Sequence, residues 1–362
     1  MRMEKILPIE IKPMVTSECW TYYKFAILQT VNSFDYWLST HMAICMDNNG
    51  RVLFGENGSI YPLSYYSEIL SVSEKKYGSI SKSDIIDFLI CEIDKGNYVI
   101  LDVNYNKIAN RSREVFRSHE TLIYGYNKKE KVFYSPILSN GIFRQEKISF
   151  DCMAESYGDA VLHFMNNMDE RQRFNRRQYF CGITIITPQE VRWFSNIYYD
   201  FISRMSSIIS KRVFITETYG SNIETKQIGK YYTGLSCFLK LSELIEINSE
   251  TENALRWFNI ADLSCVKLFE YRNMIIRKMK WYVSAFKEPN KEMIELIETY
   301  EDLKDEMKNI MLMNEKCYYS RNIEILKRIG IRLKSIYETD HELIEQFLEH
   351  ARKMYTSGLL EF

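Results

Sequence analysis

The fold of the first half of this chain is decided by the stretch His119-Glu-Thr-Leu-Ile-Tyr-Gly-Tyr126, which Val132-Phe-Tyr-Ser-Pro136 follows. Both segments are rich in β-branched and aromatic residues, which favour strands. Between them lies Tyr126-Asn-Lys-Lys-Glu130, which predicts a tight hairpin. We therefore expect two antiparallel strands, with His119 opening the first.

The segments on either side of this hairpin extend the same pattern. Tyr98-Val-Ile-Leu-Asp-Val103 is predicted to be a strand, and residues 179–186 form a later strand that could return to the same sheet. Residues 83–94 carry an apolar stripe at helical spacing, and Gly96 is expected to end that helix. The first half is therefore expected to be an α+β unit with an antiparallel sheet core.

The second half changes character after Pro188 and becomes mostly helical. Apolar residues recur at helical spacing in five segments, which are 192–211, 235–247, 253–286, 291–316 and 321–351. A chain of 362 residues is long enough for two domains. We expect a catalytic domain over 1–187 and a helical domain over 188–362 that covers the site.

A cysteine lies near the N-terminus, where a helix is predicted to start at Ser17 or Glu18. Cys19 at such a junction meets unpaired amide groups and the positive end of the helix dipole, which favour a thiolate and a lowered pKa. His119, at the start of its strand, can face such a helix end and take the thiol proton. The sequence therefore predicts a nucleophile–base pair of Cys19 and His119.

The other histidines and cysteines are weaker candidates for a catalytic or metal-binding role. His41 is the rival base, but it lies close to Cys19 in sequence, and His163, His341 and His350 fall in helical, charged contexts. The eight cysteines include no CxxC pair, so they predict neither a zinc site nor a disulfide framework. No phosphate-binding loop appears, and we expect no metal or nucleotide cofactor.

Charge and hydropathy argue against a nucleic-acid-binding protein and against a membrane protein. The formal net charge is −1, which gives no electrostatic reason to expect nucleic-acid binding. No apolar run reaches the roughly 18 residues that cross a bilayer, and the first residues lack an apolar signal segment. We expect a cytoplasmic protein, without a membrane partner, whose cysteines are reduced thiols.

These motifs together resemble the papain-like cysteine protease superfamily, in the branch that contains bacteriocin-leader peptidases and the acyltransferase of butirosin biosynthesis. Ser17-Glu-Cys-Trp20 resembles the start of the nucleophile helix, and residues 96–102 resemble the strand before the histidine. The stretch 119–136 resembles the histidine strand, glycine turn and final strand of that branch. Tyr231-Tyr-Thr-Gly-Leu235 and the helices after it resemble the butirosin-type C-terminal region.

The resemblance implies a reaction. An acyl group would move from a carrier-protein thioester to Cys19 and then to an amine, forming an amide. Within the branch, the chain is most similar to the amide-forming transacylases of closthioamide-type assembly. That similarity implies natural-product biosynthesis of the nonribosomal-peptide type, a 4-hydroxybenzoyl group as the acyl unit and carrier-bound β-alanine as the amine. The phosphopantetheine arm would arrive on the carrier protein.

This chain departs from the motifs of the branch at two positions, and each departure leaves one role in the site unassigned. Leader peptidases carry Asp-Pro where this chain has Ser135-Pro136, so the third member of the triad is not fixed. Asp102 is the first candidate for orienting His119, and Ser135, Asn127 and Asn140 are the others. The superfamily's glutamine before the cysteine is also missing, which leaves the Cys19 amide, with Thr16 or Ser17, to stabilise an oxyanion.

Both departures favour thioester capture over proteolysis, because a thiolate leaves more easily than an amine. A cysteine peptidase or amidase remains the alternative enzyme, and an inactive module that binds carrier proteins is the non-enzymatic alternative. The basic cluster Arg171, Arg173, Arg176 and Arg177 is either a docking patch for an acidic carrier or a solvated surface.

Overall fold

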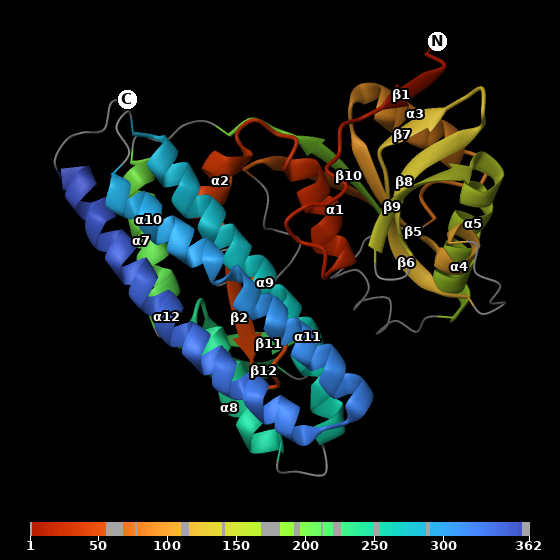
Figure 1. The fold of residues 1–362 in the computed structure, drawn as a ribbon. Coiled ribbons are helices and arrows are strands. Elements are labelled where there is room, and N and C mark those ends of the chain that lie inside the picture. Colours follow the sequence, from red (N-terminus) through yellow and green to blue (C-terminus); the bar gives the residue numbers. More distant parts are fainter. Residues whose placement is uncertain are drawn as a thin grey trace. The chain divides into compact units, whose positions relative to one another are not determined.

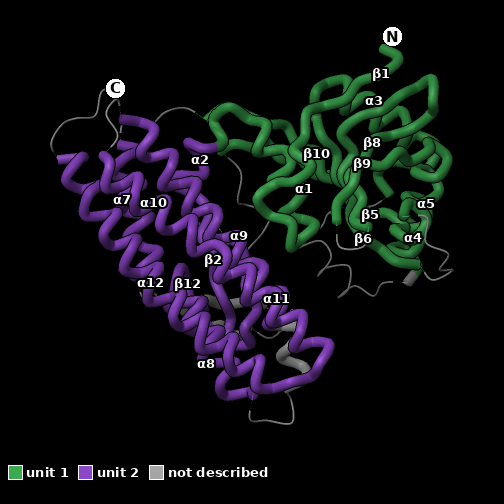
Figure 2. The backbone as a smooth tube through the Cα atoms, in the orientation of Figure 1, with its two compact units in different colours: residues 1–34, 66–191, 221–224 green, residues 35–65, 192–220, 225–362 purple. Residues whose placement is uncertain are grey.

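A computed structural model describes residues 2–55, 68–76, 78–109, 116–139, 142–167, 182–191, 196–210, 213–219, 226–249, 254–286 and 290–356. The chain divides into two compact units, drawn in green and purple in Figure 2. The first unit comprises 1–34, 66–191 and 221–224, and the second comprises 35–65, 192–220 and 225–362. The N-terminal half carries antiparallel sheets and the C-terminal half is mostly helical, which confirms the expected α+β class.

The first unit is built on two four-stranded antiparallel sheets (Figure 1). One has the order β1-β7-β8-β9 and consists of β1 (Glu4–Ile6), β7 (Gly125–Asn127), β8 (Val132–Ser139) and β9 (Ile142–Ser149). The other has the order β4-β10-β5-β6 and consists of β4 (Leu70–Lys75), β10 (Ile183–Pro188), β5 (Tyr98–Asn104) and β6 (Ser118–Ile123). The predicted hairpin joins β7 to β8, and the predicted late strand does return to β5.

Four helices complete this unit: α1 (Cys19–Leu28), α3 (Ile85–Lys95), α4 (Tyr105–Ile108) and α5 (Phe150–Asn167). Every residue of α1 from Thr21 to Leu28 is buried, so this helix lies inside the unit rather than on its surface. Helix α3 ends at Gly96, whose φ of 91° is readily adopted only without a side chain, as the sequence predicted. Both α3 and α5 pack on β5.

The second unit combines one antiparallel sheet with helices. The sheet has the order β11-β12-β2-β3 and consists of β11 (Val213–Tyr219), β12 (Lys226–Thr233), β2 (Ala43–Asp47) and β3 (Val52–Gly55). Its helices are α2 (Phe34–Thr40), α7 (Ile197–Ile209), α8 (Ser236–Ser249), α9 (Ala254–Ser284), α10 (Lys291–Asp302), α11 (Lys304–Ser320) and α12 (Ile323–Thr356). The sequence predicted the helices after Pro188 but not the β11–β12 hairpin.

The assignment of residues 35–65 differs from the expected domain division, which placed them in a domain over 1–187. The structure groups them with the second unit. Helix α9 holds the described part of this segment through hydrogen bonds to its backbone: Lys267 donates to the Val52 carbonyl, and Lys278 donates to those of His41 and Met42. Strand β2 also pairs with β12. The segment is therefore bound to elements more than 170 residues further along the chain.

Gly234 fixes the junction between β12 and α8, inside the Tyr231–Leu235 motif. Its φ is +59°, and a Cβ at this position would lie 2.3 Å from the Ile208 backbone oxygen. Its amide donates to the Ile44 carbonyl, and the next amide donates to that of Ile208. The motif therefore joins β2, α7 and α8 by backbone contacts that only glycine allows.

A buried ion pair lies between the helices of the second unit. Arg272 of α9 donates two charge-assisted hydrogen bonds of 2.9 Å to Asp340 of α12. Tyr300 of α10 donates a third, also of 2.9 Å, to the same carboxylate. Both charged side chains are at most 2% exposed. Removing one partner would leave the other charge buried without compensation.

We expect Asp340→Asn to destabilise the protein by about 3–5 kcal/mol, because the Arg272 guanidinium would lose its counter-ion in a low-dielectric core. Urea denaturation followed by far-ultraviolet circular dichroism measures the change. The matched control is Asp305→Asn, which breaks an exposed pair with Lys308 and should change stability little, because solvent screens that pair. Equal losses of unfolding free energy in the two variants would show that the buried pair contributes no more to stability than the exposed pair.

Candidate active site

Helix α1 places Cys19 at its first residue. Glu18 precedes it with extended backbone (φ −133°, ψ 123°), and the first helical hydrogen bond runs from the Tyr22 amide to the Glu18 carbonyl. The start of this helix therefore agrees with the sequence-based expectation. Because α1 is buried on all sides, its N-terminal residue is fixed in position, and the Cys19 side chain itself is half-buried.

Strand β6 supplies the other two side chains of the site. In the part of the chain that the structure describes, it pairs within its sheet with β5, with His119 opposite Val103 and Glu120 opposite Asp102. The side chains of His119 and Glu120 are 19% and 22% exposed. Helix α1 contacts β6, which brings Cys19 to this strand.

Cys19, His119 and Glu120 meet in one cluster. The Cys19 Sγ, one ring nitrogen of His119 and one carboxylate oxygen of Glu120 all lie within 4.8 Å of one another. The structure thus brings together the predicted nucleophile and base from positions a hundred residues apart. The third side chain of the cluster is one that the sequence analysis did not select.

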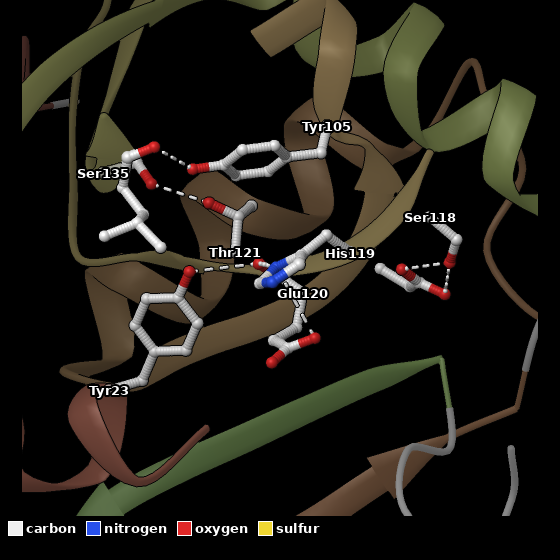
Figure 3. A network of polar contacts seen from close by, with 9 residues as sticks. Tyr23, Tyr105, Ser118, His119, Glu120, Thr121 and Ser135 are labelled. Atoms are coloured by element: carbon white, nitrogen blue, oxygen red, sulfur yellow. Dashed lines mark hydrogen bonds and ion pairs between the residues drawn. The ribbon is translucent and has the colours of Figure 1, made fainter. Parts of the chain in front are cut away.

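The orientation of the His119 ring follows from its contacts (Figure 3). Its Nδ1 lies 2.8 Å from the Glu120 backbone oxygen, a group that can only accept, so Nδ1 carries the proton. The other ring nitrogen, Nε2, is then left with a lone pair and can act as a base. Tyr105 packs against the ring at 4.9 Å between centroids, and Nδ1 also lies 3.6 Å from the Glu120 carboxylate.

Tyr23 of α1 ties the helix to this strand. Its hydroxyl donates a 3.0 Å hydrogen bond to the Glu120 backbone oxygen that also accepts from His119 (Figure 3). The Tyr23 side chain is fully buried. A single carbonyl therefore links the helix that carries the thiol to the ring that faces it.

Asp102, the first candidate for orienting His119, has its carboxylate directed to another residue. Both of its oxygens accept from the Ser118 hydroxyl, at 2.7 and 2.6 Å. Glu120 contacts the Nδ1 side of the ring, which is the side that an orienting group would need. The role of Asp102 stays a prediction, and the structure adds Glu120 as a candidate that stands closer to the ring.

The other candidates for the third position lie in different surroundings. Ser135 is fully buried and shares a 2.8 Å hydrogen bond with Thr121. Asn127 lies at the β7–β8 turn, where it donates to Glu4 and accepts from the Glu130 amide. Asn140 is outside the described residues, as is the Arg171–Arg177 cluster. The rival base His41 belongs to the second unit, where its Nδ1 lies 2.7 Å from the Trp37 carbonyl.

Electrostatics leave the Cys19 thiol protonated at rest. Burial, and after it the negative charge of Glu120, raises the pKa of the Cys19 thiol to about 12. The Cys19 backbone N–H and the charge of Arg117 act in the opposite direction, but with less effect. The sequence-based expectation of a lowered pKa is therefore wrong, because desolvation outweighs the helix terminus. A protonated thiol must give up its proton as it attacks.

Glu120 was not among the residues selected from the sequence. Neighbouring residues of a strand normally point to opposite faces, so alternation alone gives no reason to place Glu120 beside His119. In the structure both side chains lie near Cys19. No short motif in the sequence marks this arrangement.

Comparison with known proteins adds no family to this description. No protein-family model matches the chain, and no curated protein matches it either. Among the described residues, none of the helices is long and apolar enough to span a membrane.

We expect the rate of Cys19 alkylation by iodoacetamide to rise steadily from pH 7 to pH 10 without a plateau, because the thiol pKa lies near 12. Removing the Glu120 charge in Glu120→Gln should shift the profile to lower pH, since that charge raises the thiol pKa. Peptide mass spectrometry at Cys19 measures the rate separately from the exposed Cys91.

Glu130→Gln is the matched control for this experiment, because it removes an exposed carboxylate of the β7–β8 turn that pairs with Lys147. Its profile should coincide with that of the wild type. A plateau at neutral pH in the wild type would instead show a thiol pKa far below 12 and contradict the protonated thiol described above.

Proposed function

We propose that this chain is a papain-like cysteine acyltransferase that moves an acyl group from a carrier-protein thioester through acyl-Cys19 to an amine. The observation that carries the proposal is the cluster of the Cys19 thiol, the His119 ring and the Glu120 carboxylate within 4.8 Å. A helix-borne cysteine facing a histidine on an antiparallel strand is also the arrangement that the sequence resemblance implies. The protein then belongs to the branch with leader peptidases and butirosin-type acyltransferases.

The first half-reaction uses the groups already in place. His119 Nε2 takes the thiol proton as the Cys19 sulfur attacks the thioester carbonyl. The carbonyl carbon forms a bond to Sγ, and its bond to the carrier's pantetheine sulfur breaks. The departing thiolate takes the proton from the imidazolium, so the half-reaction needs no other reactant.

The second half-reaction reverses these roles. The amine attacks the acyl-Cys19 carbonyl, His119 accepts the ammonium proton and returns it to the leaving Cys19 sulfur. The amide forms and the thiol is restored. The imidazolium that arises in both steps lies beside the Glu120 carboxylate, which stabilises it as an orienting acid does in a catalytic triad.

The leaving group favours thioester capture over peptide cleavage. A thioester releases its thiolate with little acid catalysis, whereas an amide must expel a poor leaving group. The proposed donor is a 4-hydroxybenzoyl thioester and the proposed acceptor is carrier-bound β-alanine, as the resemblance implies.

The test combines intact mass and product partition. Incubation with an acyl-carrier thioester should add the acyl mass to the wild type, and Cys19→Ala should remove that adduct. Supplying amines, including carrier-bound β-alanine, should convert the adduct mainly to amide. The matched control is Cys91→Ala, which removes an exposed cysteine of α3 and should behave as wild type.

Two outcomes would overturn this function. An adduct of equal yield in Cys19→Ala would place the nucleophile elsewhere. Free acid with every amine, or ready cleavage of peptides, would favour the hydrolase, and no adduct in any protein would favour a module that only binds carriers.

A groove between α11 and α12 supports a carrier-protein partner. It is lined by Met313, Lys316, Ile325, Arg328, Ile331 and Arg332. The apolar Ile331 is 70% exposed and its neighbour Leu312 is 63% exposed. Residues 304–334 carry eight basic and four acidic side chains, although the whole chain has a net charge of −1. Positive charge is therefore concentrated around an exposed apolar strip.

We assign the donor carrier protein to this groove on grounds of charge. Carrier proteins are acidic, and an acidic helix with an apolar face complements a basic, apolar groove. Lys316 and Arg328 are exposed, and no ion pair of either appears among the described residues. Arg332 is already paired with Glu306 at 2.7 Å.

We expect the double variant Lys316→Glu/Arg328→Glu to raise KM for the acyl carrier by about tenfold or more, with kcat for a short acyl-pantetheine thioester unchanged. Two like charges would repel the carrier, while the thiol site is untouched. The matched control is Lys291→Glu/Lys353→Glu, which makes the same charge change on exposed positions of α10 and α12 outside the groove. An unchanged KM for the carrier, or conversion of a dimer to a monomer by the groove variant, would remove the carrier from this groove.

A further inference from the structure

The three side chains of the active-site cluster form a set of metal ligands. A thiol sulfur, an imidazole nitrogen and a carboxylate oxygen, all within 4.8 Å of one another, are donors that zinc accepts. In the part of the chain that the structure describes, no other cluster of three such groups occurs. Catalytic and labile zinc sites commonly use three protein ligands and leave a fourth position for water.

The surroundings of His119 have the form of a second shell around a metal. Histidine ligands generally donate their second N–H to a backbone carbonyl or a carboxylate, which fixes the tautomer and the ring orientation. His119 does this through Nδ1 to the Glu120 carbonyl at 2.8 Å, and Tyr23 donates to the same oxygen at 3.0 Å. The ring nitrogen with the lone pair is thereby set before any ion arrives.

The chemical types of the three donors also suit a divalent cation. One divalent ion would neutralise a thiolate and a carboxylate together, and its binding would release the thiol proton.

We infer that Cys19, His119 and Glu120 bind one zinc ion, and that the bound ion blocks acylation of Cys19. Binding exchanges the S–H bond for an S–Zn bond and releases the proton to solvent. Bonds of about 2.0–2.3 Å in a tetrahedral site set ligand atoms roughly 3.3–3.8 Å apart. The side chains therefore need to approach by roughly 1 Å, which rotation about their own bonds can supply. The metal site goes beyond the proposed function. The inhibition of Cys19 acylation rests on the proposed function.

Cobalt reports the thiolate ligand directly, because a Co²⁺–thiolate bond gives a charge-transfer band in the near ultraviolet. Titration of the metal-free full chain with Co²⁺ should give this band with one equivalent, and Zn²⁺ should abolish it. The band should be lost in Cys19→Ser and kept in Cys91→Ser, which changes an exposed cysteine. Tyr23→Phe should weaken Zn²⁺ binding by about 10–100-fold, as loss of a second-shell partner does.

Zinc should also protect Cys19 of the wild type from alkylation, a measurement that needs no variant and so does not depend on how Cys19→Ser folds. A missing thiolate band, a band that survives in Cys19→Ser, or alkylation at the same rate with and without zinc would overturn the metal site.

The two proposals fail separately. If Cys19 is acylated in the presence of a chelator and zinc does not slow this reaction, the inhibitory metal is wrong and the acyltransferase stands. If cobalt binds through Cys19 but no thioester ever acylates it, the metal site stands and the proposed function is wrong.

Discussion

The burial of helix α1 is the constraint on which the rest of the first unit depends. Eight consecutive residues of this helix, Thr21–Leu28, are inside the unit, so its axis cannot shift without disturbing the core. Its first residue is the cysteine. In the same helix, the Tyr23 hydroxyl donates a hydrogen bond to the Glu120 carbonyl. That carbonyl also holds the His119 ring. The position of the thiol and the orientation of the base are therefore set by one rigid body and one shared acceptor.

The same burial decides the chemistry of the thiol. A helix terminus alone would favour a thiolate, but the stabilisation that a helix dipole supplies at a solvent-exposed end is modest. Desolvation of a half-buried sulfur works against the charged form, and the Glu120 carboxylate adds to it. The Cys19 sulfur therefore keeps its proton at neutral pH.

Local patterns predicted much of this fold, and the limits of those patterns explain the rest. Strand composition identified β5, β6 and β8, and Gly96 identified the end of α3, because each signal depends on residues next to it. The Cys19–His119 pairing was also predicted from a helix start and a strand start. Glu120 and the β11–β12 hairpin were not, since the first depends on how α1 lies against β6 and the second on pairing with β2. Sheet order joins distant segments, and no short window of sequence contains it.

The division of the chain between its two units governs the order in which the protein can assemble during synthesis. Each unit consists of three separate segments, so the polypeptide passes between them repeatedly. Strands β2 and β3 leave the ribosome early, but β12, which pairs with β2, follows only after about 180 further residues, so loop closure delays this sheet. The helix that carries Cys19 likewise waits for β6. Neither unit can be excised as one continuous fragment, and a nascent chain stalled before residue 226 would expose the unpaired edge of β2 to association with other chains.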